Sequence, residues 1–417
     1  MRIAVIGAGI IGITSAWELA SDGHAVSVFE RRIAAAEEGS FANAGVVAPG
    51  YVTPWAAPGM PLKVLRHMFG RHAPVRLSLP LSGSDLSWIW RWWRACKPAI
   101  YQRNRMQLQH LAFYSRERLH RISASLQLEY DRSDGYMVLL RGATEARLVH
   151  SGLQLLRDAG IAFAEVDADQ ARRIEPALNA GTALHGAVHL PGDEVGNCRQ
   201  FGLLLKNEAL RQGVQFEFSN TVERIETGAG VALQLRGEPA PRPFDAVVVC
   251  AAVESARLLR PLGLRVPLAA VHGYSLSAAI REPLNAPRSA VMDERYKVAI
   301  SRLGQRVRVA GSAQLGGRPL RQHPGAVATL YKVLQDWFPG AASLSQGVQL
   351  WKGARPMLPD GPPLIGASGV SGVWLNLGHG SSGWALSCGS ARALADLVGG
   401  RDPGLDMRGF DAARLHP

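Results

Sequence analysis

The sequence predicts an α/β fold in which a doubly wound parallel sheet, built from separated stretches of chain, is joined to an α+β domain with an antiparallel sheet. Three observations predict it. A strand, a glycine-rich turn, a helix and a second strand follow one another between Arg2 and Glu30. Strand–helix units recur in the middle and near the C-terminus, and two stretches between them alternate as antiparallel strands do.

Length and composition are those of an ordinary globular protein. The 417 residues suffice for two or three domains at about 150 residues each. Hydrophobic residues make up 47% of the chain and charged residues 19%. The net charge of +12 fits nucleic acid, an anionic membrane or anionic small molecules as partners, or a basic surface with no specific partner. Because no Lys/Arg cluster is interleaved with aromatic residues, we expect no nucleic acid.

Cysteines and apolar runs exclude several classes of protein. The four cysteines include no C-x-x-C pair, which argues against a structural metal site and a disulfide scaffold. We therefore expect no metal and a reduced, cytoplasmic environment. No apolar run reaches the ~20 residues that span a bilayer, and the N-terminus lacks the cationic start and cleavage site of a signal peptide. A soluble or peripheral protein is expected.

The N-terminal stretch up to Glu30 is the most informative segment. Residues 2–6 are a β-branched run typical of a buried parallel strand, residues 13–21 have helical spacing, and Gly23 ends that helix. Residues 25–29 form a second strand with Glu30 at its tip. Strand, turn, helix, strand and acidic residue together indicate a dinucleotide site.

Each glycine of the turn Gly7-x-Gly9-x-x-Gly12 has its own physical reason. Gly7 allows the tight turn, Gly9 lets the backbone approach a pyrophosphate, and Gly12 permits close helix–strand packing. The free N–H groups and the positive end of the following helix attract phosphates, and Glu30 accepts hydrogen bonds from ribose hydroxyls. FAD and NAD share this pattern, so the turn alone does not separate them.

Periodicity predicts the remaining elements. Helices are expected over 144–159, 201–212, 327–338 and 384–398, with mainly helical structure over 61–130. Strands are expected over 131–140, 214–218, 222–225, 244–250 and 373–376, and antiparallel strands over 266–279 and 296–311.

Several segments then match one family in order along the chain. They are Ser40-Phe-Ala-Asn43-Ala44-Gly45, Pro49-Gly-Tyr51, Pro54-Trp-Ala-Ala-Pro-Gly59, Gly273-Tyr-Ser-Leu276, Trp351-x-Gly353-x-Arg355-Pro-Met-x-Pro359-Asp-Gly361 and Leu375-Asn-x-Gly378-His-Gly380. The chain resembles the D-amino-acid dehydrogenase branch of the FAD-dependent D-amino-acid oxidase/glycine oxidase superfamily.

The resemblance implies a Rossmann-like FAD-binding domain of the glutathione-reductase type, built from residues 1–80, 185–262 and 345–417. Residues 81–184 and 263–344 would form the substrate-binding domain. It also implies oxidative deamination of a D-amino acid to a 2-oxo acid, with electrons passed to a quinone or another respiratory acceptor at the inner face of the cytoplasmic membrane. Since no cysteine lies near Arg355, FAD is expected to bind noncovalently.

Four residues carry the expected chemistry. The resemblance makes Arg355 the first choice for the guanidinium that binds the substrate carboxylate, since it stands in the motif whose Arg has this role in the glycine oxidase relatives, and a guanidinium fork matches a carboxylate. Tyr296 is the second carboxylate ligand, with a core tyrosine as the rival interpretation and Tyr274 as the fallback. His379 would lie near the flavin, either in contact with ring or substrate or as a structural histidine that holds its loop.

The resemblance places the cofactor contacts in five further segments. The N–H groups of the segment Gly380–Gly383 would face the flavin O2/N1 edge and stabilise the reduced ring. Asn43 to Gly45 would run past the flavin, Ser40 would bond ribose or phosphate, Val222 would contact adenine, and Ala251 and Ala252 would lie close to the pyrophosphate. The remaining expected contacts are Ile10, Ile11, Arg31, Val46, Gly353, Gly378, Ser381 and Ser382.

The segment Trp88–Trp93 has two interpretations. Its tryptophans with Arg91 and Arg94 suit a membrane interface, which predicts membrane association, and a buried helix or subunit contact is the rival interpretation. Other functions also stay open: a D-proline, hydroxyproline or related secondary-amine dehydrogenase, an oxidase that uses O2, an RNA-modifying flavoprotein, and a non-catalytic nucleotide-binding module.

Overall fold

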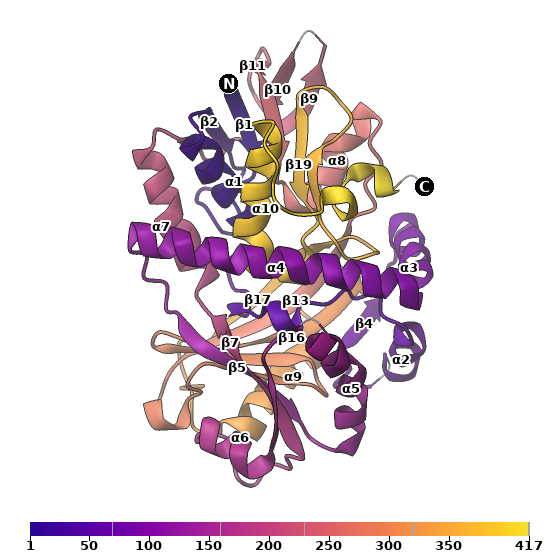
Figure 1. Cartoon of the computed structure of the whole chain (residues 1–417), viewed down its shortest axis with the longest axis vertical. Helices are drawn as coiled ribbons and strands as arrows, with labels where there is room; N and C mark the ends of the chain where they lie inside the picture. Colours follow the sequence, from indigo (N-terminus) through magenta and orange to yellow (C-terminus); the bar gives the residue numbers. More distant parts are fainter. Residues whose placement is uncertain (69, 159, 229, 319–320, 416–417) are drawn as a thin grey trace.

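The computed structural model describes residues 1–68, 70–158, 160–228, 230–318 and 321–415. The N-terminal βαβ unit forms the centre of a six-stranded sheet of order β18-β19-β12-β1-β2-β8, in the upper half of Figure 1. Its pairings are parallel apart from that of β18 with β19. The strands are β1 (Arg2–Ile6), β2 (Ala25–Phe29), β8 (Gln215–Glu217), β12 (Ala246–Val249), β18 (Leu364–Ala367) and β19 (Val373–Leu377).

Both faces of this sheet are covered, which explains the continuous apolar runs of its strands. In β1, Ile3 and Val5 belong to the core shared with α1 (Ile10–Ser21), α7 (Cys198–Arg211) and α10 (Gly383–Val398). Ala4 and Ile6 belong to the core on the opposite face, which is covered by β9 (Val222–Thr227), β10 (Val231–Leu235) and β11 (Arg242–Phe244). These three strands form a separate antiparallel sheet.

A ten-stranded sheet fills the lower half of Figure 1. Its main order is β17-β13-β16-β15-β14-β5-β7-β3, with β4 beside β16 and β6 beside β7. One face packs on α6 (Ala168–Ile174) and α9 (Pro324–Trp337). The strands are β3 (Val46–Val47), β4 (Val75–Ser78), β5 (Ser133–Leu140), β6 (Ala164–Asp167), β7 (Gly186–Val195), β13 (Ala269–Ala279), β14 (Ala290–Asp293), β15 (Val298–Leu303), β16 (Arg306–Gly316) and β17 (Gln349–Met357).

The long helix α4 (Pro98–Leu126) crosses the molecule between the two large sheets (Figure 1). Three helices, α2 (Met60–His67), α3 (Gly83–Ala95) and α5 (Ala143–Asp158), lie on the side of the molecule reached by the first half of α4. The short elements are α8 (Ser255–Leu259) and the 3₁₀ turns η1 (Pro49–Tyr51), η2 (Ala252–Glu254), η3 (Arg260–Leu262), η4 (Pro283–Asn285), η5 (Gly380–Ser382), η6 (Met407–Gly409) and η7 (Ala412–Leu415).

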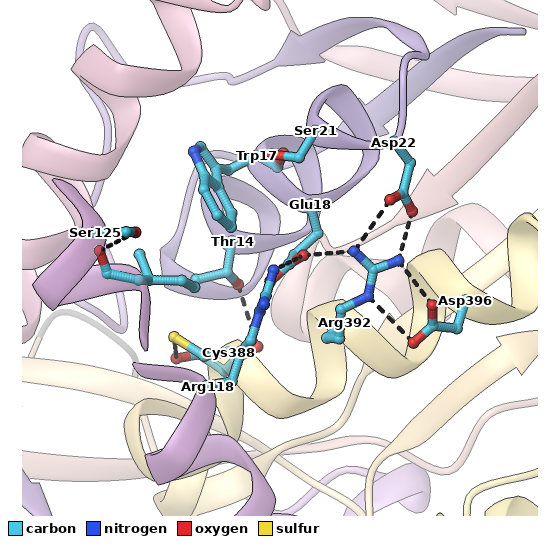
Figure 2. Close-up of polar contacts among 12 residues, drawn as sticks. Thr14, Trp17, Glu18, Ser21, Asp22, Arg118, Ser125, Cys388, Arg392 and Asp396 are labelled. Carbon is cyan, nitrogen blue, oxygen red and sulfur yellow. Dashed lines mark hydrogen bonds and ion pairs between the residues drawn. The ribbon is translucent and has the colours of Figure 1, made fainter. Parts of the chain in front are cut away.

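A buried carboxylate joins α4 to the six-stranded sheet. Glu18 of α1 is 0% exposed and accepts hydrogen bonds from Arg118 Nε at 2.6 Å and Nη2 at 2.8 Å. Arg392 of α10 donates to the same carboxylate at 2.8 Å and also pairs with Asp22 and Asp396 (Figure 2). One carboxylate thus ties three helices from distant parts of the chain.

The βαβ unit and the two-sheet division predicted from the sequence are confirmed, and the stretch 296–311 is divided between β15 and β16. Strand pairing places β3, β4, β7 and β17 in the ten-stranded sheet, although their residues fall in 1–80, 185–262 and 345–417. The domain boundaries therefore stay a prediction. Among the described helices, none has both the length and the apolar character required to cross a bilayer.

Candidate active site

The glycine turn between β1 and α1 is sterically fixed at two of its three glycines. Gly7 has φ +105°, and a Cβ there would lie 2.7 Å from the Cys250 carbonyl oxygen. A Cβ on Gly12 would lie 1.8 Å from the Gly7 carbonyl oxygen. The nearest atom to a Cβ on Gly9 is Ser40 Oγ at 3.5 Å, an ordinary contact. The protein itself thus leaves room at Gly9, as expected where a ligand approaches the backbone.

Polar side chains hold this turn in place. Glu30 accepts hydrogen bonds from the Ala8 and Arg32 amides at 2.8 Å each. Ser40 Oγ accepts the Ile10 amide at the start of α1 at 3.0 Å. Arg31 is bound by Glu38 and lies 3.6 Å from Glu254. Glu30 and Ser40 therefore shape the turn, and both line the large cavity below it.

That cavity has a volume of about 1620 Å³ and runs between the two large sheets. All the predicted site residues line it except Gly12, Gly45 and Tyr296. Gly12 packs against Gly7 instead, and the Gly45 carbonyl accepts Trp384 Nε1 at 3.2 Å. Residues that are far apart in the sequence therefore meet around one space.

Arg355 of β17 lines the cavity from the ten-stranded sheet. Its guanidinium crosses over Gly273, where a Cβ would come within 2.3 Å of Nη2. Nη1 donates to the Ser312 carbonyl at 2.9 Å, and no carboxylate of the described residues forms an ion pair with it. Burial lowers the pKa of Arg355 to about 10, so it is cationic at neutral pH. Most of its N–H donors stay free to bind an anion.

The two predicted tyrosines lie in different surroundings. Tyr274 lines the cavity, but its hydroxyl is bonded to Gln314 and accepts the His323 amide at 3.2 Å. Tyr296 packs its ring against His72 and beneath Arg141. The structure therefore does not bring Tyr296 to the cavity with Arg355; the turn after β14 directs it into the core around α9.

His379 lines the cavity, and a residue of α10 contacts its imidazole ring. Nε2 lies 3.1 Å from Ser390 Oγ on α10, and burial lowers the pKa of the imidazole to about 3. It is neutral at physiological pH, which matches a structural histidine that holds the Gly378–Gly380 loop. The residues that follow open η5 and α10, and no side chain caps either N-terminus. These residues border the cavity, and the Ser382 amide donates to the His379 carbonyl at 3.2 Å.

The loop 43–46 is held by residues that the sequence analysis did not select. Ser301 Oγ donates to the Ala44 carbonyl at 2.6 Å, and Arg308 donates to the Asn43 carbonyl at 3.2 Å. Burial lowers the pKa of Arg308 to about 10. Both residues come from the ten-stranded sheet, so that sheet positions a loop whose Gly45 carbonyl accepts Trp384 of α10. No local pattern marks them in the sequence.

A second polar group in the cavity was also missed. Tyr51 of η1 donates to Glu294 at 2.5 Å and accepts from Lys297 Nζ at 3.0 Å, and Lys297 pairs with Glu294. All three line the cavity. The motif Pro49-Gly-Tyr51 was the available signal, and Glu294 lies close to Tyr296 in the sequence.

Comparison with known proteins decides the family. The model of the family "DAO: FAD dependent oxidoreductase" matches residues 2–397. The chain belongs to this family. It is 41% identical over 432 residues to a D-amino acid dehydrogenase of Cereibacter sphaeroides, covering 100% of this chain and 99% of the relative. A D-amino acid dehydrogenase of another strain is 42% identical, covering 97% and 93%.

Solved structures agree on the fold. Glycine oxidase from Geobacillus kaustophilus has a TM-score of 0.75 at 22% identity, with 99% of each chain covered. L-proline dehydrogenase from P. horikoshii has a TM-score of 0.74 at 15% identity, covering 99% of this chain and 97% of that one. This DAO-family chain is therefore an FAD-dependent oxidoreductase with the predicted fold class.

The residues present fit FAD. The open approach at Gly9 and the α1 N-terminus suit a pyrophosphate, and Glu30 faces the same end of the cavity. The uncapped N-termini of η5 and α10 suit the electron-rich edge of a reduced flavin. Cys388 is buried within α10, and no other cysteine is near Arg355 in the sequence, in keeping with noncovalent binding.

Proposed function

We propose that this DAO-family chain is a D-amino-acid dehydrogenase, which converts a D-amino acid to a 2-oxo acid and ammonia. The observation that carries the proposal is Arg355, a half-buried cation in the flavin cavity with free N–H donors and no carboxylate partner among the described residues. Such a guanidinium suits the carboxylate that all amino acids share. The names of the two full-length relatives support the same substrate class.

The protein's part in the reaction is mainly to orient the substrate. Arg355 holds the carboxylate, and Gly273, which has no Cβ, leaves the space that the guanidinium itself occupies over the sheet. The bound FAD supplies the chemistry by accepting the hydride from Cα. Walls formed by both large sheets limit the access of water during that transfer.

The test is anaerobic bleaching of the flavin absorbance with a panel of D- and L-amino acids, including D-alanine, D-proline and glycine. We expect bleaching by D-amino acids and not by their L-enantiomers. Arg355→Lys should raise the substrate concentration for half-maximal bleaching at least 100-fold, because Lys cannot provide the bidentate fork. Arg306→Lys, on the same sheet outside the cavity, is the matched control. Failure of every D-amino acid to bleach the flavin would refute the proposal.

We further propose that electrons leave to a membrane quinone, with the protein bound peripherally. Supporting this, α3 presents Leu86, Trp90 and Trp93 to solvent at spacings of four and three residues, and the latter two are 53% and 60% exposed. The rings of Trp88 and Trp92 stack on each other and are buried. The tryptophan segment thus has a core face and an exposed apolar face, and Arg94 lies over Trp90.

Vesicle sedimentation tests the membrane contact. Trp90→Ala with Trp93→Ala should reduce binding to anionic vesicles at least fivefold, whereas Leu210→Ala, an exposed leucine on α7, should not. Equal sedimentation of the double variant and the parent would refute the membrane contact.

The choice of O2 as electron acceptor has its own test. Hydrogen peroxide formed as fast as a dye is reduced would indicate an oxidase.

A further inference from the structure

Residues 43–45 form a loop whose three carbonyl oxygens are all bound by the protein. The Asn43 oxygen accepts Arg308 Nη1 at 3.2 Å, and the Ala44 oxygen accepts Ser301 Oγ at 2.6 Å. The third oxygen, that of Gly45, accepts one backbone amide at 2.8 Å and one indole N–H at 3.2 Å. Because each oxygen is already bound, this loop does not present a carbonyl group to a ligand in the cavity.

The N–H groups of the same loop differ in how they are satisfied. The Gly45 amide donates to Asn43 Oδ1 at 2.9 Å, whereas the Ala44 amide has no acceptor among the described residues. In a planar trans peptide the C=O and the N–H point in opposite directions. Since Arg308 binds the C=O of the Asn43–Ala44 peptide, the N–H of that peptide points away from Arg308. Asn43 and Ala44 line the cavity and Arg308 does not, so the N–H is directed to the cavity side.

Strand pairing explains why two side chains reach the loop together. Ser301 of β15 and Arg308 of β16 lie directly opposite each other, and so do Ala299 and Ala310, two residues further along. Alternate residues of a strand share a face of the sheet, so all four side chains point to the same side. Ala299 and Ala310 line the cavity. Ser301 and Arg308 therefore lie just beyond a part of the cavity wall that consists of small side chains.

Arg308 also brings a positive charge to this place. It forms no ion pair among the described residues, and burial lowers the pKa of its guanidinium to about 10, so it stays cationic at neutral pH. With hydrogen bonds of about 3 Å on either side of the peptide, the guanidinium lies about 8 Å from an acceptor that binds the Ala44 N–H. That distance is within the ~10 Å over which salt at 0.1 M screens a charge. The other titratable groups around it are Arg199, Arg306, Asp131 and Cys198.

We infer that Arg308, together with Ser301, positions the flavin ring by fixing the Asn43–Ala44 peptide, whose N–H donates to an acceptor atom of the ring. The inference rests on the FAD dependence of the family and is independent of the substrate. The bound flavin supplies the electron acceptor, and its ring gains negative charge on reduction. The Arg308 cation stabilises that charge. Arg308 thus acts on the flavin both through the loop and through its electric field.

The test measures the cofactor and not turnover. Arg308→Met should raise the Kd of FAD, measured from its release on dilution of the holoenzyme, about tenfold, because a hydrogen bond from a charged donor is lost. It should also make the reduction potential of the bound flavin more negative. Arg308→Lys keeps the charge and should retain the potential of the parent. Ser301→Ala removes one neutral hydrogen bond and should raise the Kd about threefold, with a smaller change of the potential.

Hydrogen exchange at the Ala44 amide reports the proposed contact directly. In the parent, bound FAD should slow this exchange about tenfold relative to the apoprotein, and in Arg308→Met the slowing should be lost. Matched controls are Arg306→Met, on the same strand and face as Arg308, and Ser277→Ala, which removes the hydroxyl that Arg306 binds. Both controls should keep the Kd and the Ala44 exchange of the parent.

An Ala44 amide whose exchange FAD does not slow would overturn the inference, as would an unchanged Kd and potential in Arg308→Met. Equal losses in Arg306→Met and Arg308→Met would overturn it too, because they would indicate a general effect on the sheet. If Arg308→Met gives no folded protein, Ser301→Ala decides: an unchanged Kd and unchanged Ala44 exchange in that variant overturn the inference. Failure of every D-amino acid to bleach the flavin refutes the proposed function instead.

Discussion

Replacement of Glu18 by Gln should destabilise the protein far more than a change of one atom suggests. The side chain is fully buried and accepts three short hydrogen bonds from Arg118 and Arg392. Gln keeps the shape and removes the negative charge. Arg392 retains Asp22 and Asp396, but Arg118 forms no other ion pair among the described residues and is only 23% exposed.

Loss of one member of a buried pair typically costs about 3–5 kcal/mol, and the carboxylates left to Arg392 reduce this to about 2–4 kcal/mol. At an unfolding entropy of about 2.1 cal/mol/K per residue, a chain of 417 residues loses roughly 2–5 °C in Tm. Calorimetry of the holoprotein measures this shift. Arg118→Met alone should be destabilising too, and adding it to Glu18→Gln should restore part of the loss, because the unpaired charge is gone. A Tm within about 1 °C of the parent, or strictly additive losses, would refute the reasoning.

Other predictions concern the site and one buried carboxylate outside it. Gly9→Ala should leave the Tm of the apoprotein within about 1 °C but weaken FAD binding at least tenfold. Gly12→Ala, whose Cβ would lie 1.8 Å from the Gly7 carbonyl oxygen, should instead lower the yield of folded protein. FAD titration measures the first effect and circular dichroism the second. His379→Asn should change the amplitude and not the shape of the kcat/KM profile between pH 6 and 9, since its pKa is about 3. Burial raises the pKa of Asp193 to about 7, so its ionisation lowers stability as pH rises from about 4 to 7. Asp193→Asn should therefore raise Tm at pH 8 and have little effect at pH 4; equal shifts at both pH values would contradict this.

Local patterns in the sequence predicted the βαβ unit well. The turn, the helix and the strands between Arg2 and Glu30 are neighbours in the chain. The steric limit on Gly12 comes from Gly7 of the same unit, and the limit on Gly7 comes from Cys250, which follows β12. β7 was missed because Pro191-Gly192-Asp193 indicates a turn, although it lies within a strand paired with β5.

The candidate site was predicted only where a motif marks it. Arg355 and the Gly378–Gly383 segment stand in recognisable runs. Tyr296 was chosen and Glu294 was not considered, because a strand interpretation does not show that a tight turn follows Asp293 and changes which residues face the cavity. Arg308 has no local signal at all. Its importance comes from a neighbour that is distant in the sequence, Asn43.

The order of the six-stranded sheet also constrains how the protein is made. β1 lies between β2 and β12, so one edge of this central strand has no partner until Val249 has been synthesised. The face of the sheet that packs against helices is completed by α10, which ends at Val398. The nascent chain must carry an apolar strand and an unfinished nucleotide site until α10 has been synthesised, and such delayed pairing exposes a chain to aggregation. FAD capture should consequently wait until α10 has been synthesised, and a ribosome-bound chain truncated before β19 should not retain the flavin.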